Sequence, residues 1–171
     1  MKINPRLETI GKLVPSSSLV LDLGCDHAYL PLYLVKNRGF KKVYASDNKE
    51  GPLKIAALNI HKMNCDNNIE LILAEGLDAY REGIDTLIIS GMGGLSINKI
   101  LLADQKKLKN FKTIILSPNN FIPAVRINMA RFGFIIKDEL VVKDKNIIYP
   151  ILIFEQGKAR YKKEDLYLGP I

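Results

Sequence analysis

The sequence predicts an α/β fold with a doubly wound, mostly parallel sheet. Five short runs rich in β-branched residues recur along the chain, and stretches with helical spacing separate them. The runs are apolar on both faces, which is typical of parallel strands covered by helices. Strand–helix alternation of this kind indicates a parallel, doubly wound sheet. The five runs are 18–23, 42–47, 69–74, 85–90 and 112–117.

The remaining elements are assigned in chain order. The segment "LVPSSS" (13–18) separates an N-terminal helix from the first strand. Leu53, Ala56, Ala57 and Ile60 then follow the i, i+3, i+4, i+7 spacing of an amphipathic helix. The stretch "FIIKDELVVKDKNIIYPILIFEQG" (134–157) predicts two strands joined by the turn "KDKN", and hence an antiparallel pair at one edge of the sheet. We expect one domain over 1–157, followed by a charged tail or the stub of another element over 158–171.

Length and composition are those of one globular domain with its own core. The 171 residues are 47% hydrophobic and 25% charged, which is ordinary for such a domain. No stretch approaches the roughly 20 apolar residues of a membrane span, and the charged N-terminal segment lacks the apolar core of a signal peptide. Cys25 and Cys65 show no metal spacing and no disulfide framework. We therefore expect a cytoplasmic monomer without a membrane segment or a metal.

The positive charge is concentrated in the second half of the chain. The formal net charge is +7. Residues 1–85 hold 11 Lys and Arg against 11 Asp and Glu, whereas residues 86–171 hold 14 against 7. Such one-sided charge is what a surface for a polyanion would show. The alternative is a solvated lysine-rich surface, and charge alone favours that alternative.

The first strand ends in a sharp glycine turn, "DLGCDHA" (22–28). Pro31 fits only in the first turn of a helix, so we expect a helix from about Tyr29 and a loop over 24–28. In an open α/β sheet, ligands bind at the carboxyl ends of the strands, near the point where the strand order reverses. This loop is therefore predicted to lie beneath a ligand.

The loop carries an acid where nucleotide-binding loops carry glycine. Dinucleotide folds need several glycines so that pyrophosphate can approach the backbone. This chain has Gly24, but Asp26 and Ala28 occupy the next expected positions. A carboxylate at Asp26 would repel phosphate, which argues against NAD, FAD and nucleoside triphosphates. It suits S-adenosylmethionine, which has a sulfonium, an ammonium and no phosphate. The alternative is that Asp26 only caps the helix.

The next two strand ends also carry acids. Asp47 lies 23 residues after Gly24, close to the spacing of about 20 for an acid that bonds ribose hydroxyls. Glu75, Gly76 and Leu77 follow the third strand and would suit the edge of the cofactor's adenine. The "EG" pair is equally well explained as a simple turn, so both interpretations stay open.

The fourth and fifth strand ends complete the predicted rim. Three glycines in "GMGG" (91–94) allow close approach of the backbone, and Met92 offers a soft apolar surface to a sulfonium or a base. "SPNN" (117–120) follows the fifth strand. Asn119 is the plainest hydrogen-bonding side chain there for the edge of a base.

Together these segments resemble the bacterial tRNA (adenine-N1)-methyltransferases of the TrmK type, which modify adenine 22 of tRNA. The resemblance rests on "DLGCDHAYLPLYL", "ASDNKEGPLKIA", "AEGLDA", "ISGMGG" and "LSPNNFIPAVR", in order along nearly the whole chain. It implies a Rossmann-like class I methyltransferase fold that uses S-adenosylmethionine. The residues that it implies at the cofactor are Asp22, Gly24, Asp26, His27, Asp47, Glu75, Gly76, Leu77 and Met92.

The chain departs from the family pattern in two places. The family tends to have "GDG" where this chain has "AEG", so a longer side chain would contact adenine. The family also continues into a long helical C-terminal domain, whereas this chain stops at "YLGPI". Residues 158–171 would then be a charged tail or the stub of that domain.

The implied chemistry is methyl transfer to N1 of adenine. N1 carries a lone pair, so catalysis is mostly positioning, and a base would take the proton that the N6 amine releases. Asp26 is the first candidate base, with Asn119 orienting N6. His27 is the second candidate base; alternatively it is structural or contacts the methionine carboxylate of the cofactor.

Three hypotheses for the function stay open at this point. The protein methylates tRNA, methylates another substrate with the same cofactor, or binds cofactor or RNA without catalysis. For the first, basic residues of the helices after "GMGG" and "SPNN" would line one rim and hold RNA phosphates. These residues are Lys99, Lys106, Lys107, Lys109, Arg126 and Arg131.

Overall fold

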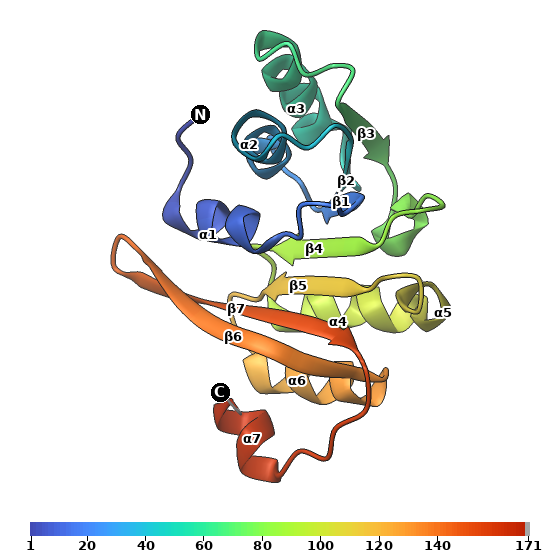
Figure 1. Cartoon of the computed structure of the whole chain (residues 1–171), viewed down its shortest axis with the longest axis vertical. Helices are drawn as coiled ribbons and strands as arrows, with labels where there is room; N and C mark the ends of the chain where they lie inside the picture. Colours follow the sequence, from blue (N-terminus) through green and yellow to red (C-terminus); the bar gives the residue numbers. More distant parts are fainter. Residues whose placement is uncertain (170–171) are drawn as a thin grey trace.

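The computed structural model describes residues 1–169 and confirms the predicted α/β sheet. Its seven strands run in the order β3-β2-β1-β4-β5-β7-β6, as Figure 1 shows. Strands β1 to β5 pair in parallel, whereas β7 is antiparallel to both β5 and β6. The strands are β1 (Val20–Leu23), β2 (Val43–Asp47), β3 (Ile69–Leu73), β4 (Thr86–Ser90), β5 (Thr113–Ser117), β6 (Phe134–Asp144) and β7 (Ile147–Gln156).

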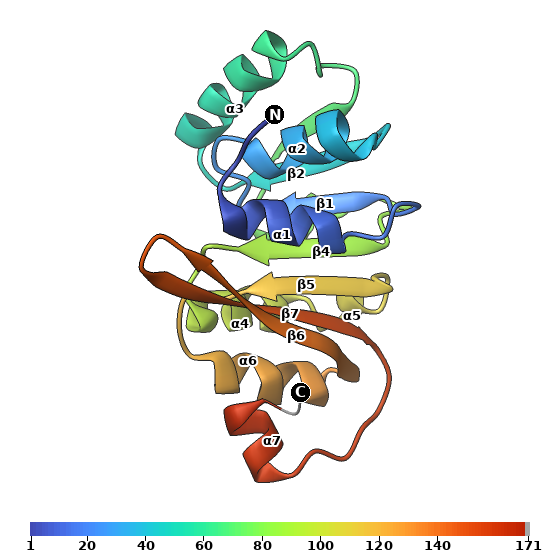
Figure 2. The same ribbon diagram turned by 60° about the vertical axis from the view of Figure 1, so that its left-hand side comes forward.

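The helices cover both faces of this sheet (Figure 2). One face packs against α1, α2 and α3, and the other against α4, α5 and α6. The helices are α1 (Pro5–Leu13), α2 (Tyr29–Arg38), α3 (Glu50–Lys62), α4 (Gly94–Ala103), α5 (Gln105–Leu108), α6 (Ile122–Arg131) and α7 (Lys163–Leu168), with a 3₁₀ turn, η1 (Gly76–Ala79), after β3.

Alternate residues of the central strands build two separate cores. In β1, Val20 packs with α1 to α3, whereas Leu21 packs on the opposite face. In β4, Ile88 packs on the face of α1 to α3 and Leu87 packs on the opposite face. Side chains of successive strand residues point to opposite faces, so a strand covered by helices on both sides is apolar throughout. This explains why the runs are continuous rather than alternating.

The strand order reverses between β1 and β4. From β1 the chain moves outward to β2 and β3, and then crosses back to place β4 on the other side of β1. The loops that follow β1 and β4 therefore diverge to opposite faces and leave a crevice at their carboxyl ends. The helix after β1 begins at Tyr29, as predicted, with Ala28 as its N-cap.

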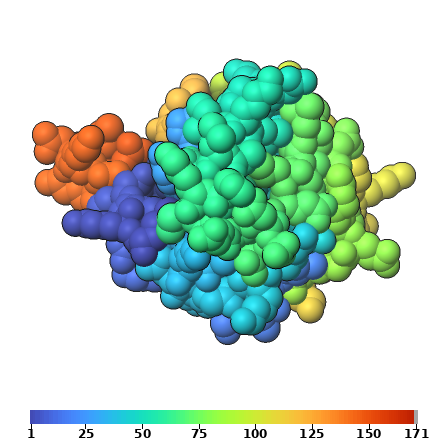
Figure 3. All heavy atoms as spheres, turned by 90° about the horizontal axis from the view of Figure 1, so that it is seen from above, coloured from blue at the N-terminus to red at the C-terminus, as the bar shows by residue number. Residues whose placement is uncertain are grey.

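The β6–β7 hairpin projects past the sheet at the edge where the parallel strands end (Figures 1 and 2). The space-filling view shows it as a lobe beside the N-terminal segment (Figure 3). Its turn lies within the predicted segment "KDKN" (143–146). Lys145 in this turn has the left-handed conformation, with φ +56°. The segment after β7 contains α7, which packs on α6.

Arg126 anchors α7 to the body of the domain. Its guanidinium pairs with Glu139 of β6 and donates hydrogen bonds of 3.1 Å to the carbonyl oxygens of Leu166 and Tyr167. Arg126 is 5% exposed. The carbonyls at the end of a helix have no partner within it, so the arginine satisfies groups that α7 leaves open.

Candidate active site

Two adjoining clefts open along the edge where β1 to β4 end. The first, of about 590 Å³, lies between the β1 loop and α1 and is called the α1 cleft. The second, of about 410 Å³, lies between the ends of β2, β3 and β4 and is called the β3 cleft. Residues that line both clefts are Gly24, Asp47, Asn48, Lys49 and Met92. The predicted ligand edge therefore holds two adjoining concave surfaces.

The β1 loop has the backbone of a glycine-rich turn with only one glycine in it. Gly24, Asp26 and Ala28 all have positive φ angles, of 76°, 50° and 60°. Left-handed backbone is unfavourable for alanine and tolerated by aspartate. The backbone amides of Gly24 and Cys25 both donate to the carbonyl oxygen of Ser46 at 2.8 Å. These bonds tie the loop to the end of β2 and hold it in this conformation.

Asp26 points into the α1 cleft and does not cap α2. Its side chain is 70% exposed and lines the cleft. The N-cap of α2 is Ala28, and no side chain bonds to the first amides of the helix. The capping alternative for Asp26 is therefore wrong, and its carboxylate faces the cleft.

His27 lies beside the cleft rather than in it. Its Nε2 is 3.4 Å from Oδ1 of Asp26, and its ring packs edge-on against Tyr29. Within residues 1–169, His27 lines neither cleft. The geometry places His27 in contact with Asp26 and outside the lining of both clefts.

Two more carboxyl groups border the α1 cleft. Asp22, in β1, is buried at 4% exposure, and Asp47 ends β2. Burial, together with the negative charge of Asp47, raises the pKa of Asp22 to about 7. Burial also raises the pKa of the Cys25 thiol, with Asp22 and Asp47 adding to the effect. Cys25 therefore stays protonated and is not a nucleophile.

The β3 cleft brings together the predicted adenine and ribose contacts. Oδ1 of Asp47 accepts a hydrogen bond from the Lys49 amide at 3.0 Å. Asn48 donates to Oε2 of Glu75 at 2.9 Å, and Gly76 lines the same cleft. The structure corrects the prediction that Leu77 faces the cofactor. Its side chain is 3% exposed and packs in the core, because η1 turns it inward.

Met92 forms the wall between the two clefts. It lines both of them, and its terminal methyl group lies against the α-carbon of Gly24. Asn119 accepts a hydrogen bond from Arg6 at 3.2 Å and donates one to the carbonyl oxygen of Gly91 at 2.7 Å. Both ends of this amide are engaged within the protein, which differs from the predicted contact with a base edge.

Most of the predicted basic rim lies elsewhere. Lys99 lines the β3 cleft, but Lys107 is paired with Asp78 and Asp104, both at 2.9 Å. Lys106 and Lys109 are exposed, in α5 and just after it, beyond the far end of α4 from the clefts.

The two arginines of α6 also need correction. Arg126 is buried against Glu139, so it cannot meet RNA phosphates in this conformation. Arg131 is the last residue of α6, and nine residues of helix place it about 13 Å from the helix start. The prediction failed because it considered only where the two helices begin.

The N-terminal helix contributes residues that the sequence did not predict. Asn4, Arg6 and Leu7 line the α1 cleft, as does Tyr29 from α2. Two residues of the sequence indicate the start of α1: Asn4, whose side chain caps the helix, and Pro5, its first residue. It contains no signal that α1 packs beside the end of β4.

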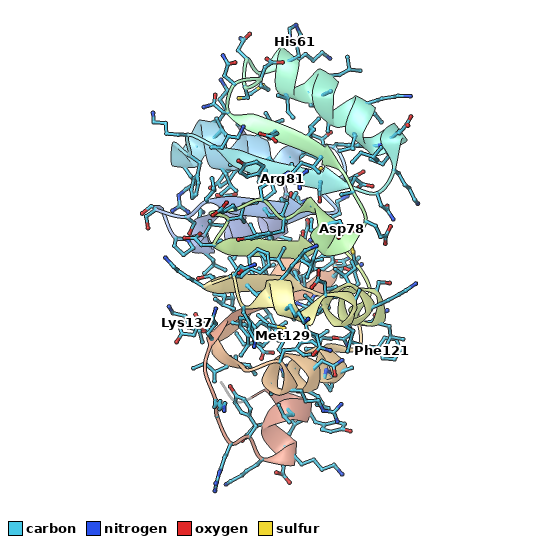
Figure 4. The ribbon with its side chains drawn as sticks, turned by 90° about the vertical axis from the view of Figure 1, so that its right-hand side faces the viewer. His61, Asp78, Arg81, Phe121, Met129 and Lys137 are labelled. Atoms are coloured by element: carbon cyan, nitrogen blue, oxygen red, sulfur yellow. The ribbon has the colours of Figure 1, made fainter. Side chains whose placement is uncertain are left out.

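Phe121 is a further exposed aromatic side chain near this edge. It precedes α6 with φ +52° and is 54% exposed. Figure 4 shows it pointing outward, whereas Met129 of α6 points toward the sheet. Across residues 1–169, no helix is long and apolar enough to cross a membrane, and no cluster of three or more His, Cys, Asp or Glu side chains could hold a metal.

Comparison with known proteins agrees with this geometry. Residues 3–152 match the family model described as a methyltransferase domain. The tRNA (adenine(22)-N(1))-methyltransferase of Bacillus subtilis (strain 168) is 30% identical over 158 residues, which are 92% of this chain. The match covers 66% of the Bacillus protein, so the chain spans slightly less than two thirds of that relative.

Two solved structures extend the similarity to the fold. Sp1610 of Streptococcus pneumoniae, in complex with S-adenosyl-L-methionine, has a TM-score of 0.95 and 35% identity, covering 99% of this chain and 80% of that one. TrmK of M. capricolum, in complex with S-adenosyl-homocysteine, has a TM-score of 0.87 and 29% identity, covering 98% and 75%. The family model, the Bacillus relative and these structures agree, so the chain belongs to the methyltransferase-domain family and, within it, to the TrmK-type proteins.

Proposed function

We propose that the chain transfers a methyl group from S-adenosylmethionine to N1 of adenine 22 in tRNA. The observation that carries this proposal is the pair of adjoining clefts at the β1–β4 boundary, which share Gly24, Asp47 and Met92 among their lining residues. One cleft has room for the cofactor's adenosine, and the other has room for its methionine end and a second base. The named relatives support the same reaction and cofactor.

The side chains of the clefts fit this cofactor. Asp22, Asp26 and Asp47 surround the α1 cleft, and they would attract an ammonium and a sulfonium while repelling a phosphate. A cation beside Asp22 would favour its ionised form and oppose the effect of burial. Asp47 would bond the ribose hydroxyls, and Glu75 with Gly76 would contact the adenine across the β3 cleft.

The chain's own part in the reaction would be positioning and proton transfer. When bound, S-adenosylmethionine supplies an electrophilic methyl group. Met92 and Gly24 would shape the passage between the two clefts. Asp26, exposed in the α1 cleft, would accept the proton from the N6 amine of the target. Asn119 would act indirectly, by holding Arg6 and the Gly91 backbone in place.

The target adenine must leave its stack to enter the α1 cleft. The N1 edge is hidden in duplex RNA, so the base would be splayed out or flipped. Tyr29 borders the cleft and is 46% exposed, which gives it a ring face on which a base could stack. A tRNA substrate would place the protein in the bacterial cytoplasm.

We also propose residues 1–157 as the methyltransferase domain, with 158–171 as a charged tail or the beginning of a further helical element. Activity as a monomer is part of the same proposal. The β6–β7 hairpin lies at one edge of the sheet, and α7 packs on α6 (Figure 1).

The test is methylation of an unmodified tRNA transcript with labelled S-adenosylmethionine, followed by mapping of the modified nucleoside. We expect 1-methyladenosine at position 22. A transcript with guanine in place of adenine 22 is the matched control and should remain unlabelled. Labelling of a protein or small molecule instead would favour the same cofactor with another substrate. Cofactor binding without any transfer would favour a non-catalytic binding module.

A further inference from the structure

Arg6 lines the α1 cleft and lies in the first turn of α1. The start of this helix is well fixed: Asn4 accepts a hydrogen bond from the Leu7 amide at 2.8 Å, and Pro5 is the first helical residue. Figures 1 and 2 place this end of α1 at the edge where the parallel strands end, beside the β6–β7 hairpin.

Two uncharged groups hold the guanidinium of Arg6. Its Nη1 donates to Oδ1 of Asn119 at 3.2 Å. Its Cζ lies 4.3 Å from the ring centroid of Tyr149, which is a cation–π contact. Asn119 follows β5 and Tyr149 lies in β7, so three distant segments meet at this arginine. The guanidinium is thus oriented without being neutralised.

No ion pair within residues 1–169 involves Arg6. Arg126 provides the contrast, because its charge is matched by Glu139 inside the domain. An arginine that is held in place but not paired with an acid is suited to bind an anionic group of a ligand. Its planar fork matches the oxygens of a phosphate or a carboxylate.

The position of Arg6 in the sheet indicates which molecule brings that anion. Asn119 follows β5, and a β-carbon on Gly91, which follows β4, would lie 3.4 Å from Nη2 of Arg6. The proposed cofactor contacts Asp26, Asp47 and Glu75 lie at or just after the ends of β1, β2 and β3. Arg6 is therefore across the strand-order reversal from them, on the side from which a methyl acceptor would approach.

We infer that Arg6 binds a phosphate of the RNA nucleotide whose base enters the α1 cleft. This inference rests on the proposed function and adds a specific substrate contact to it. Tyr149 and Asn119 are positioning residues, which act by holding the guanidinium. The other available oxyanion is the methionine carboxylate of the cofactor, and the experiment separates these two sources.

The experiment compares Arg6→Gln with Arg131→Gln, which removes the same charge from the far end of α6. Each variant is measured for tRNA binding over a range of salt, for kcat and KM with tRNA, and for S-adenosylmethionine affinity by calorimetry. We expect Arg6→Gln to weaken tRNA binding by about 10- to 100-fold, as for loss of a charge-assisted hydrogen bond. The slope of log affinity against log salt should fall by about 0.7–0.9.

Cofactor affinity should stay within about twofold in Arg6→Gln, and Arg131→Gln should keep the wild-type salt slope. Arg6→Lys should recover part of the affinity, because it keeps the charge but loses the fork. An equal loss of tRNA and cofactor binding in Arg6→Gln would assign the arginine to the methionine carboxylate. Identical behaviour of Arg6→Gln and Arg131→Gln would also overturn the inference.

A second pair of variants tests the positioning role while leaving Arg6 intact. Tyr149→Phe keeps the ring and should bind tRNA as the wild type does. Tyr149→Ala should weaken binding, and it should have no further effect once Arg6 is glutamine. If the wild type binds tRNA but transfers no methyl group, the proposed function fails while the salt slopes still decide the role of Arg6. If it binds no tRNA, both fail.

Discussion

The terminal methyl group of Met92 lies against the α-carbon of Gly24, so a β-carbon at position 24 would overlap it. The two residues belong to loops on opposite sides of the strand-order reversal, after β4 and β1. Gly24 is also in the left-handed conformation, with φ +76°. A side chain there would meet both a steric and a conformational obstacle at the wall between the two clefts.

Gly24→Ala is therefore expected to weaken cofactor binding by pushing Met92 into the clefts that it lines. The unfolding free energy should fall by about 1–2 kcal/mol, because alanine is unfavourable in left-handed backbone. Gly39→Ala is the matched control, since Gly39 has φ +73° but no atom within 4 Å of an added β-carbon. It should lose similar stability in denaturant melts and bind cofactor normally. Equal cofactor affinities in both variants would contradict this prediction.

The raised pKa of Asp22 predicts a specific pH dependence of stability. Between its ordinary value of 3.8 and about 7, the folded protein holds a proton that the unfolded chain releases. The contribution of Asp22 to stability therefore falls as pH rises through this window and is constant above it. Asp22→Asn should remove this decline. Urea melts of the wild type and Asp22→Asn between pH 4 and 8 would show the difference. Parallel plots of unfolding free energy against pH for the two proteins would refute the prediction.

Binding of a cation beside Asp22 should release its proton. Calorimetry at pH 6 in buffers of different ionisation enthalpy should detect proton release on S-adenosylmethionine binding. Asp22→Asn should release fewer protons on S-adenosylmethionine binding. In Asp47→Asn the negative charge that helps to raise the pKa of Asp22 is gone, so the release should shift to lower pH. Proton release that is unchanged in Asp22→Asn would assign it to another group.

Asp26→Asn should separate catalysis from ligand binding. Asparagine tolerates left-handed backbone, so the φ of +50° at this position is compatible with the substitution. If Asp26 takes the N6 proton, kcat should fall by about 100-fold or more with a smaller change in cofactor affinity. His27→Gln should have the milder effect, because His27 lines neither cleft within residues 1–169. Equal losses of kcat and affinity in Asp26→Asn would leave it a binding role only.

Arg126→Glu should unfold the C-terminal side of the domain rather than act on RNA alone. It would place two carboxylates together, at positions 126 and 139, where the side chains are 5% and 11% exposed. Breaking a buried pair costs about 3–5 kcal/mol, which denaturant melts can measure. Lys106→Glu makes the same charge change on an exposed residue and should leave stability unchanged. Wild-type stability in Arg126→Glu would show that the pair is dispensable.

The sheet and its ligand edge could be predicted because both follow from local patterns. Parallel strands end at one edge, so Gly24, Asp47 and Met92 had to converge there once the strands were identified. Arg126 was misplaced although its burial was readable: it lies four residues after Ile122 and three before Met129, on the apolar face of α6. The predicted role of Arg126 follows from its charge alone, whereas its position on the helix indicates burial.

The contacts of Arg6 could not be predicted in the same way. Tyr149 lies 143 positions further along the chain, and Asn119 lies 113 positions further. The packing of α1 beside the hairpin depends on tertiary contacts that leave no periodic trace in either segment. Leu77 illustrates a smaller failure, because the short 3₁₀ turn η1 decides whether its side chain faces the cleft or the core.

The strand order also divides the chain into two consecutive parts that meet at β1 and β4. Residues 20–73 form β1 to β3, and residues 86–156 form β4 to β7. Each part is built largely from neighbouring segments, so each can acquire much of its structure early in folding. The clefts, in contrast, exist only after the two parts have docked. A ligand that spans both clefts bridges this boundary, and it should slow hydrogen exchange of the β1 and β4 amides more than that of the outer strands.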